Sequence, residues 1–142
     1  MDIRPLTPDY AVSPQIALED MAAIKEAGFA VLIDNRPDAE ISPEIQADKM
    51  REAAEAAGLT FVTNPVIGGA MTMDNVEVQG KAIAAATGPV LAYCASGNRS
   101  SQVWALSQAG DRPADELISI PARHGYQLEG LRGTLESLAG KK

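Results

Sequence analysis

The sequence is short of the residues on which several classes of protein depend. It has one cysteine, one histidine and few aromatic residues, and charged residues or glycine interrupt its apolar runs. A single cysteine excludes an internal disulfide, and a lone histidine without suitably spaced partners does not make a metal site. The short apolar runs exclude a membrane-spanning helix, and no signal-peptide core follows Met1. We therefore expect a cytoplasmic protein with no cofactor, no metal and no membrane partner.

The charged residues exclude a further group of functions. Acidic residues outnumber basic ones, the formal net charge is −7, and lysine and arginine do not cluster. Nucleic-acid binding needs a basic patch, so no nucleic-acid partner is expected. A protein this acidic can bind an anion only where backbone N–H groups, a helix N-terminus or one well-placed arginine creates local positive potential.

Glycine and short apolar runs punctuate the chain in a way that predicts an α/β fold. Three times an amphipathic stretch ends at a glycine and leads into a short apolar run, which is typical of helices alternating with buried parallel strands. We expect one domain over residues 1–142, with flexible ends at 1–5 and 140–142, and a mainly parallel four- to five-stranded sheet flanked by helices. The expected helices are 18–27, 42–57, 74–86, 99–109, 114–120 and 127–138, and the expected strands are 29–33, 59–62 and 90–93.

The run that follows the last expected strand carries the candidate chemistry. Cys94 ends this strand, and a helix is expected to begin at Arg99. Ligands of open α/β sheets bind beyond the carboxyl ends of the strands. Small residues let backbone N–H groups turn inward around an anion, and the helix N-terminus adds positive potential that favours a thiolate. The predicted anion-binding loop consists of Ala95, Ser96, Gly97 and Asn98.

Three residues of this run have predicted catalytic roles. Cys94 is the nucleophile, and the planar guanidinium of Arg99 can hold two oxygens of a tetrahedral anion. Ser100 can donate a hydrogen bond to the Cys94 sulfur and make it a better leaving group. The alternative is that Cys94 is a buried core thiol and Arg99 a surface residue. The agreement between strand, small-residue loop, arginine and hydroxyl favours the nucleophile.

Six segments of the chain resemble the phosphatase-like domain of the beta-lactamase-hydrolase-like proteins, a family also described as sulfur transferases. The resemblance implies a fold similar to protein tyrosine and dual-specificity phosphatases. It also implies that Cys94 attacks phosphorus, that Arg99 holds the phosphoryl oxygens and that Ser100 is the supporting hydroxyl. The segments are VSPQI at 12–16, IDNRPDAE at 33–40, PVIGG at 65–69, GPVLAYC with its loop at 88–100, WAL at 104–106 and GYQL at 125–128.

Two departures from the phosphatase pattern leave the attacked atom open. The loop between Cys94 and Arg99 is one residue shorter than in phosphatases and has the length found in rhodanese-type sulfurtransferases. Phosphatases also use an aspartic acid on an upstream loop as general acid, but residues 64–69 contain no acid. Asp38 and Asp74 are the candidate crevice carboxylates, although Asp74 also suits the start of a helix.

Arg36 allows two interpretations: it holds a substrate anion in the crevice, or it pairs with Asp38 or Glu40. The chain as a whole allows three functions. The first is phosphomonoester hydrolysis through a cysteinyl-phosphate, and the second is sulfur transfer through a Cys94 persulfide. The third is a non-catalytic anion-binding module. The expected partner is a small anionic or sulfur-bearing substrate, with a phosphoprotein or a low-molecular-weight thiol as the candidates. His124 is expected to be a surface or hydrogen-bonded histidine.

Overall fold

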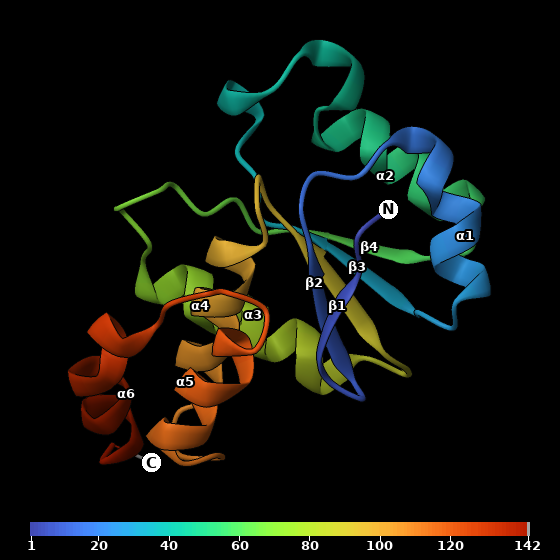
Figure 1. Cartoon of the computed structure of the whole chain (residues 1–142). Helices are drawn as coiled ribbons and strands as arrows, with labels where there is room; N and C mark the ends of the chain where they lie inside the picture. Colours follow the sequence, from blue (N-terminus) through green and yellow to red (C-terminus); the bar gives the residue numbers. More distant parts are fainter. Residues whose placement is uncertain (142) are drawn as a thin grey trace.

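The computed structural model describes residues 1–141, which form a five-stranded sheet between two layers of helices (Figure 1). The strand order is β1-β2-β5-β3-β4, and all neighbouring strands are parallel except β1 and β2. The expected α/β fold with a mainly parallel sheet is therefore confirmed. The elements, with short 3-10 helices labelled η, are β1 (Arg4–Thr7), β2 (Tyr10–Ser13), η1 (Leu18–Asp20), α1 (Met21–Glu26), β3 (Val31–Asp34), η2 (Asp38–Glu40), η3 (Pro43–Ile45), α2 (Ala47–Ala56), β4 (Thr60–Thr63), α3 (Met73–Ala85), β5 (Val90–Tyr93), α4 (Asn98–Ser107), α5 (Ala114–Ala122), η4 (Glu129–Leu131) and α6 (Arg132–Ala139).

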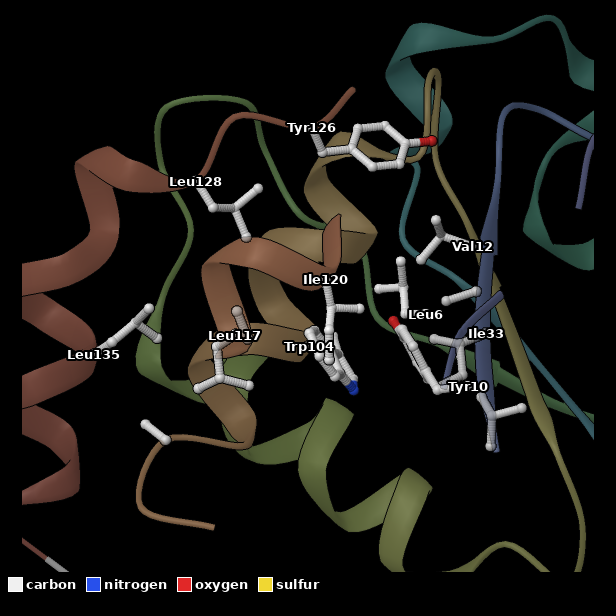
Figure 2. Packing of buried hydrophobic residues seen from close by; sticks show 14 of the residues in the cluster. Leu6, Tyr10, Val12, Ile33, Trp104, Leu117, Ile120, Tyr126, Leu128 and Leu135 are labelled. Carbon is white, nitrogen blue, oxygen red and sulfur yellow. The ribbon is translucent and has the colours of Figure 1, made fainter. Parts of the chain in front are cut away.

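The sheet has an apolar core on each face because its central strands are buried on both sides. Successive side chains of a strand point to opposite faces, so Ile33 joins one core and Leu32 the other. The helices α3 to α6 cover the Ile33 face, where Trp104 and Leu117 pack (Figure 2). The helices α1 and α2 cover the opposite face, to which Met50 contributes. This arrangement fixes β5, the middle strand, from both sides.

Two of the three glycine signals mark helix ends as expected. Gly28 and Gly58 have φ angles of 101° and 88°, the left-handed conformation that closes a helix. Gly88 does not have a positive φ, because α3 ends in extended backbone at Ala86. A side chain at Gly88 would place its Cβ 3.0 Å from the Cβ of Ala30, so close packing accounts for this glycine.

The boundaries of several elements differ from the expectation. The helix expected from Ser42 begins at Ala47, because residues 43–45 form a separate 3-10 turn and the Ser42 side chain caps nothing. The last expected helix is similarly divided into η4 and α6. At the N-terminus Arg4 pairs with Val12, so β1 begins within the stretch expected to be flexible. Of the expected C-terminal tail, Lys142 lies outside the described residues. No helix in residues 1–141 has the length and apolar character needed to cross a membrane.

Candidate active site

Cys94 lies directly after β5, at the carboxyl end of the middle strand. Its backbone N–H donates to Ser13 O at 3.4 Å, which ties this position to the neighbouring strand. Its sulfur accepts a hydrogen bond from Gly97 N at 3.1 Å, and the side chain is fully buried. A sulfur that accepts from a backbone donor is suited to carrying negative charge. Cys94 therefore forms the base of the loop, as a nucleophile in this position must.

The backbone from Ala95 into the first turn of α4 presents N–H groups that have no acceptor among the described residues. Within residues 1–141, the amides of Ala95, Ser96, Arg99 and Ser100 have no hydrogen-bond acceptor, whereas Asn98 N donates to Ser96 Oγ at 3.2 Å. These N–H groups lie at the start of α4, where the sequence predicts an anion-binding loop. Such a concave row of N–H groups binds tetrahedral anions. Ser96 Oγ stabilises the turn by accepting this bond.

Tyr126 closes this loop from the outside, a role that the sequence did not indicate. Its hydroxyl donates to Ser96 O at 2.7 Å and accepts from Arg4 Nη1 at 2.7 Å. Figure 2 shows the ring reaching from the segment after α5 toward the turn before α4. Gly97 has a φ of 95°, and a Cβ there would lie 2.2 Å from the Tyr126 oxygen. Position 97 therefore requires glycine for both conformation and space.

The guanidinium of Arg99 is held by two partners. Nη1 and Nη2 donate to the two carboxylate oxygens of Glu40, both at 2.7 Å, and Nη1 also donates to Val66 O at 2.8 Å. Glu40 is the larger cause of a raised Arg99 pKa, to which the nearby Cys94 also contributes. A guanidinium has five N–H groups, and these bonds use three of them. The edge formed by Nε and the second hydrogen of Nη2 has no oxygen acceptor among the described residues. That edge has the fork geometry that grips two oxygens.

Glu40 joins two arginines and was not among the predicted site residues. Arg36 Nε donates to Glu40 Oε1 at 3.3 Å, and Arg36 Nη1 donates to Gln15 Oε1 at 3.2 Å. Of the two interpretations of Arg36, the structure shows the pairing with Glu40. The hydrogen bonds from Arg99 hold the pKa of Glu40 below its usual value, so this carboxyl is ionised at neutral pH. A sequence signal did exist, because Glu40 lies four residues after Arg36.

The two predicted crevice carboxylates lie at helix starts. Asp38 Oδ1 accepts from the backbone N–H of Ala47 at 2.8 Å, at the beginning of α2. Asp74 is exposed in the first turn of α3, behind the capping residue Thr72. In the described part of the chain neither carboxylate is hydrogen-bonded to Cys94 or Arg99. Both positions are explained by the attraction between acidic groups and helix N-termini.

Ser100 does not make the predicted bond to the Cys94 sulfur. Its hydroxyl carries one hydrogen, which it donates to Asn35 Oδ1 at 2.9 Å. Asn35 in turn donates to Gln79 Oε1 and to Asn64 O, both at 2.9 Å, and its backbone oxygen accepts from Val66 N at 2.9 Å. This buried network joins the start of α4 to the loop after β4. It therefore positions Val66 O, which is a partner of Arg99.

A buried carboxyl lies next to the site residue Tyr93. Asp34 is opposite Tyr93 in the pairing of β3 and β5, and its Oδ1 accepts from Arg36 N at 2.9 Å. Within residues 1–141 the other oxygen, Oδ2, and the Tyr93 hydroxyl have no hydrogen-bond partner. Burial raises the pKa of Asp34 to about 6.

The sequence of this chain is similar to those of known proteins. Residues 2–111 match the family model of the Beta-lactamase hydrolase-like protein, phosphatase-like domain. The chain belongs to this family. A Beta-lactamase hydrolase-like protein from Xylella fastidiosa (strain Temecula1) is 32% identical over 130 residues, which cover 90% of this chain. The same match covers 30% of that relative, so this chain corresponds to less than a third of it.

Solved structures similar to this family member have the same fold. The crystal structure of a candidate phosphatase from Neisseria meningitidis Z2491 has a TM-score of 0.82 at 33% identity and covers 97% of this chain and 99% of its own. The structure of Tk-PTP in the active form has a TM-score of 0.72 at 13% identity and covers 99% and 97% of the two chains. The expected similarity to the protein tyrosine phosphatase fold is confirmed.

Proposed function

We propose that this domain is a cysteine-dependent phosphomonoesterase whose nucleophile is Cys94. The orientation of Arg99 carries the proposal: Glu40 and Val66 engage three of its N–H groups and leave the Nε–Nη2 edge for a substrate. That edge can hold two oxygens of a phosphoryl group, and the amides of Ala95, Ser96, Arg99 and Ser100 can bind the third. The membership of a phosphatase-like family supports the same reaction.

The proposed reaction has two displacement steps at phosphorus. The Cys94 thiolate attacks the phosphorus atom, the S–P bond forms, and the bond from phosphorus to the ester oxygen breaks. The departing oxyanion takes a proton from water. A water molecule then attacks the phosphorus, the S–P bond breaks, and orthophosphate leaves with the thiolate restored. Arg99 and the loop amides balance the negative charge of the phosphoryl oxygens in both steps.

The carboxylates around the site determine which leaving groups can depart from phosphorus. Within residues 1–141, Glu40 is the carboxylate hydrogen-bonded to Arg99, and its lowered pKa keeps it ionised at neutral pH. An ionised carboxylate cannot protonate the departing oxygen. The proposed substrates are therefore phosphoryl compounds whose leaving oxygen is stable as an anion, such as aryl esters and acyl phosphates.

A phosphatase assay with a series of aryl phosphates tests the proposal. We expect hydrolysis with kcat/KM that rises steeply as the pKa of the leaving phenol falls. Cys94→Ser and Arg99→Lys should each lose about a thousandfold or more of this activity. Arg112→Lys is the matched control, because Arg112 pairs with Glu116 on α5 and should tolerate the change. Equal activity in Cys94→Ser and wild type would overturn the proposal.

The missing acid also favours sulfur transfer as a second candidate. The Cys94 thiolate would attack the outer sulfur of thiosulfate or a persulfide, the S–S bond of the donor would break, and sulfite or a thiolate would leave without needing a proton. A second thiolate would then take the outer sulfur from the Cys94 persulfide and restore the thiolate. Intact mass spectrometry distinguishes the two: a single added sulfur on wild type, absent from Cys94→Ser, together with no hydrolysis of aryl phosphates, would replace the first proposal.

A further inference from the structure

An apolar trough leads away from Arg99 between the helices α3, α4 and α6. Its first part is a hollow of about 400 Å³, bounded by the loop after β4, by Arg99 and by Leu131 of η4. Its second part, of about 550 Å³, lies farther along α3 and α4. The two parts adjoin each other, because Met73, Val76 and Leu106 line both. Figure 1 shows α3 and α4 crossing close together, with α6 to one side.

The lining of the trough is mostly apolar, with Arg99 at the inner end and the charged residues Glu77, Lys81, Asp111 and Lys141 around the outer part. Among the residues that line the first part, Arg99 is the one charged residue. Ile67 and Met73, which are 61% and 53% exposed, form its edge. Exposed apolar residues of this size next to a polar site mark a binding surface. The trough follows α3 from Met73 to Ala84, a length of about 16 Å at the helical rise per residue.

We propose that this trough binds a single unbranched apolar chain of a substrate whose phosphoryl head is held by Arg99. The substrate class is an acyl or aryl phosphate whose leaving group has one aliphatic chain. The inference rests on the proposed function, because Arg99 fixes the head at the inner end of the trough. Apolar side chains predominate in the lining, which suits an aliphatic chain better than the polar backbone of a peptide. The net charge of −7 opposes an anionic bilayer, so the substrate enters as a dissolved amphiphile.

Binding of n-alkylphosphonates tests the proposal without requiring turnover. These compounds have the anionic head and a carbon–phosphorus bond that the proposed reaction does not break. Calorimetry on the wild-type protein should show affinity rising about threefold to fourfold for each added methylene until the chain reaches the end of the trough. The matching n-alcohols, which lack the head, should bind far more weakly. Affinity that does not change with chain length would overturn the proposal, and so would equal binding of the alcohols.

Two variants locate the chain in the trough. Gly80 lines the second part, and a Cβ there would lie 3.5 Å from the Cβ of Ser107, an ordinary contact, so Gly80→Leu should fold and fill the trough midway. This variant should bind short phosphonates as wild type does and lose the gain from longer chains. Met73→Asp should weaken all but the shortest chains. Val78→Asp is the matched control, because Val78 is exposed on the same helix and lines neither part.

The same measurements distinguish failure of this inference from failure of the proposed function. If aryl phosphates are hydrolysed and methylphosphonate binds, but longer chains bring no gain, the trough proposal alone is wrong. If long phosphonates bind as expected and Gly80→Leu removes the gain, but no phosphoryl compound is hydrolysed, the trough proposal stands and the phosphatase proposal fails. Dimerisation that covers the trough and blocks every phosphonate would also overturn the trough proposal.

Discussion

The two walls of the candidate site are built differently. The wall formed by the Cys94 loop is held through its buried residues Cys94, Gly97 and Ser100, although Ala95 and Ser96 are exposed. Gly97 donates to the sulfur, Tyr126 holds Ser96, and the Ser100 hydroxyl is engaged by Asn35. The opposite wall, from η2 and the loop after β4, is exposed and contacts the first wall mainly through Arg99. A rigid wall suits the groups that must hold charge in a fixed geometry, and an exposed wall suits the recognition of the rest of a substrate.

The largest effect is expected from Gly97→Ala, which places a side chain where the Cys94 loop packs against Tyr126. A residue with a side chain is strained at this φ, and its Cβ would lie 2.2 Å from the Tyr126 hydroxyl. We expect a loss of about 2 kcal/mol of stability and at least a hundredfold in kcat/KM, because the amides of the loop no longer converge. Thermal denaturation and the aryl phosphate assay measure the two losses.

The control for this prediction lies on the exposed wall. Gly68 has no positive φ, and a Cβ there would meet nothing within 4 Å. Gly68→Ala should therefore leave both stability and kcat/KM within about twofold of wild type. Equal losses in the two alanine variants would contradict the proposed difference between the walls.

The second effect concerns the contact between the walls. In Glu40→Gln the charged pair with Arg99 is lost, and the guanidinium is no longer held with its free edge toward the loop. We expect kcat/KM to fall about tenfold with little change in stability, since the pair is partly exposed. Glu44→Gln, an exposed change in the neighbouring η3, is the control. A faster Glu40→Gln enzyme would instead mean that Glu40 competes with the substrate for Arg99.

The third effect is a dependence of stability on pH, caused by the buried carboxyl of Asp34 next to the strand that leads into the Cys94 loop. The folded-state pKa of Asp34, about 6, lies above its ordinary value of 3.8, so the folded state binds the proton more tightly than the unfolded state. The contribution of Asp34 to stability therefore falls as pH rises from about 4 to 6, by at most about 3 kcal/mol. Asp34→Asn should remove this fall and raise Tm by several degrees at pH 7.5, with little change at pH 4. A variant with the pH profile of wild type would show that Asp34 is not the titrating group.

The Cys94 loop could be predicted from sequence because its signals are local. A strand, a cysteine, four small or turn-forming residues and a helix start follow one another along the chain, and each limits the next. The same holds for the left-handed glycines at 28 and 58, which close the helices that precede them. The N-terminal strands were missed because no helix ending in glycine precedes them, and Pro5 and Pro8 disrupt the pattern of the first.

The partners of the loop could not be predicted because distant segments supply them. Glu40 is 59 residues from Arg99, and Tyr126 is 30 residues from Ser96. Single-sequence patterns do not report contacts over such separations. Asn35 and Asn64 had a weak signal, since each polar residue directly follows a short strand, but their bonds to Gln79 depend on the packing of α3. The partner of Ser100 could not be predicted for the same reason, because the acceptor of its hydrogen lies at the end of another strand; its action on the Cys94 sulfur stays a prediction.

The smallest effect is expected from Ser100→Ala, which separates two roles of this hydroxyl. In the structure the hydroxyl stabilises the buried network through Asn35 Oδ1, so its removal should cost about 1 kcal/mol and lower kcat/KM a few-fold. Direct action on the Cys94 sulfur would have a different signature, because the cysteinyl-phosphate would accumulate and rapid mixing would show a burst of phenol. Ser101→Ala is the matched control, since its hydroxyl donates to Gly97 O at 2.8 Å in the same turn of α4. A burst confined to Ser100→Ala would mean that the hydroxyl turns toward the sulfur during the reaction, so that the wall formed by the Cys94 loop is less rigid than its hydrogen bonds indicate.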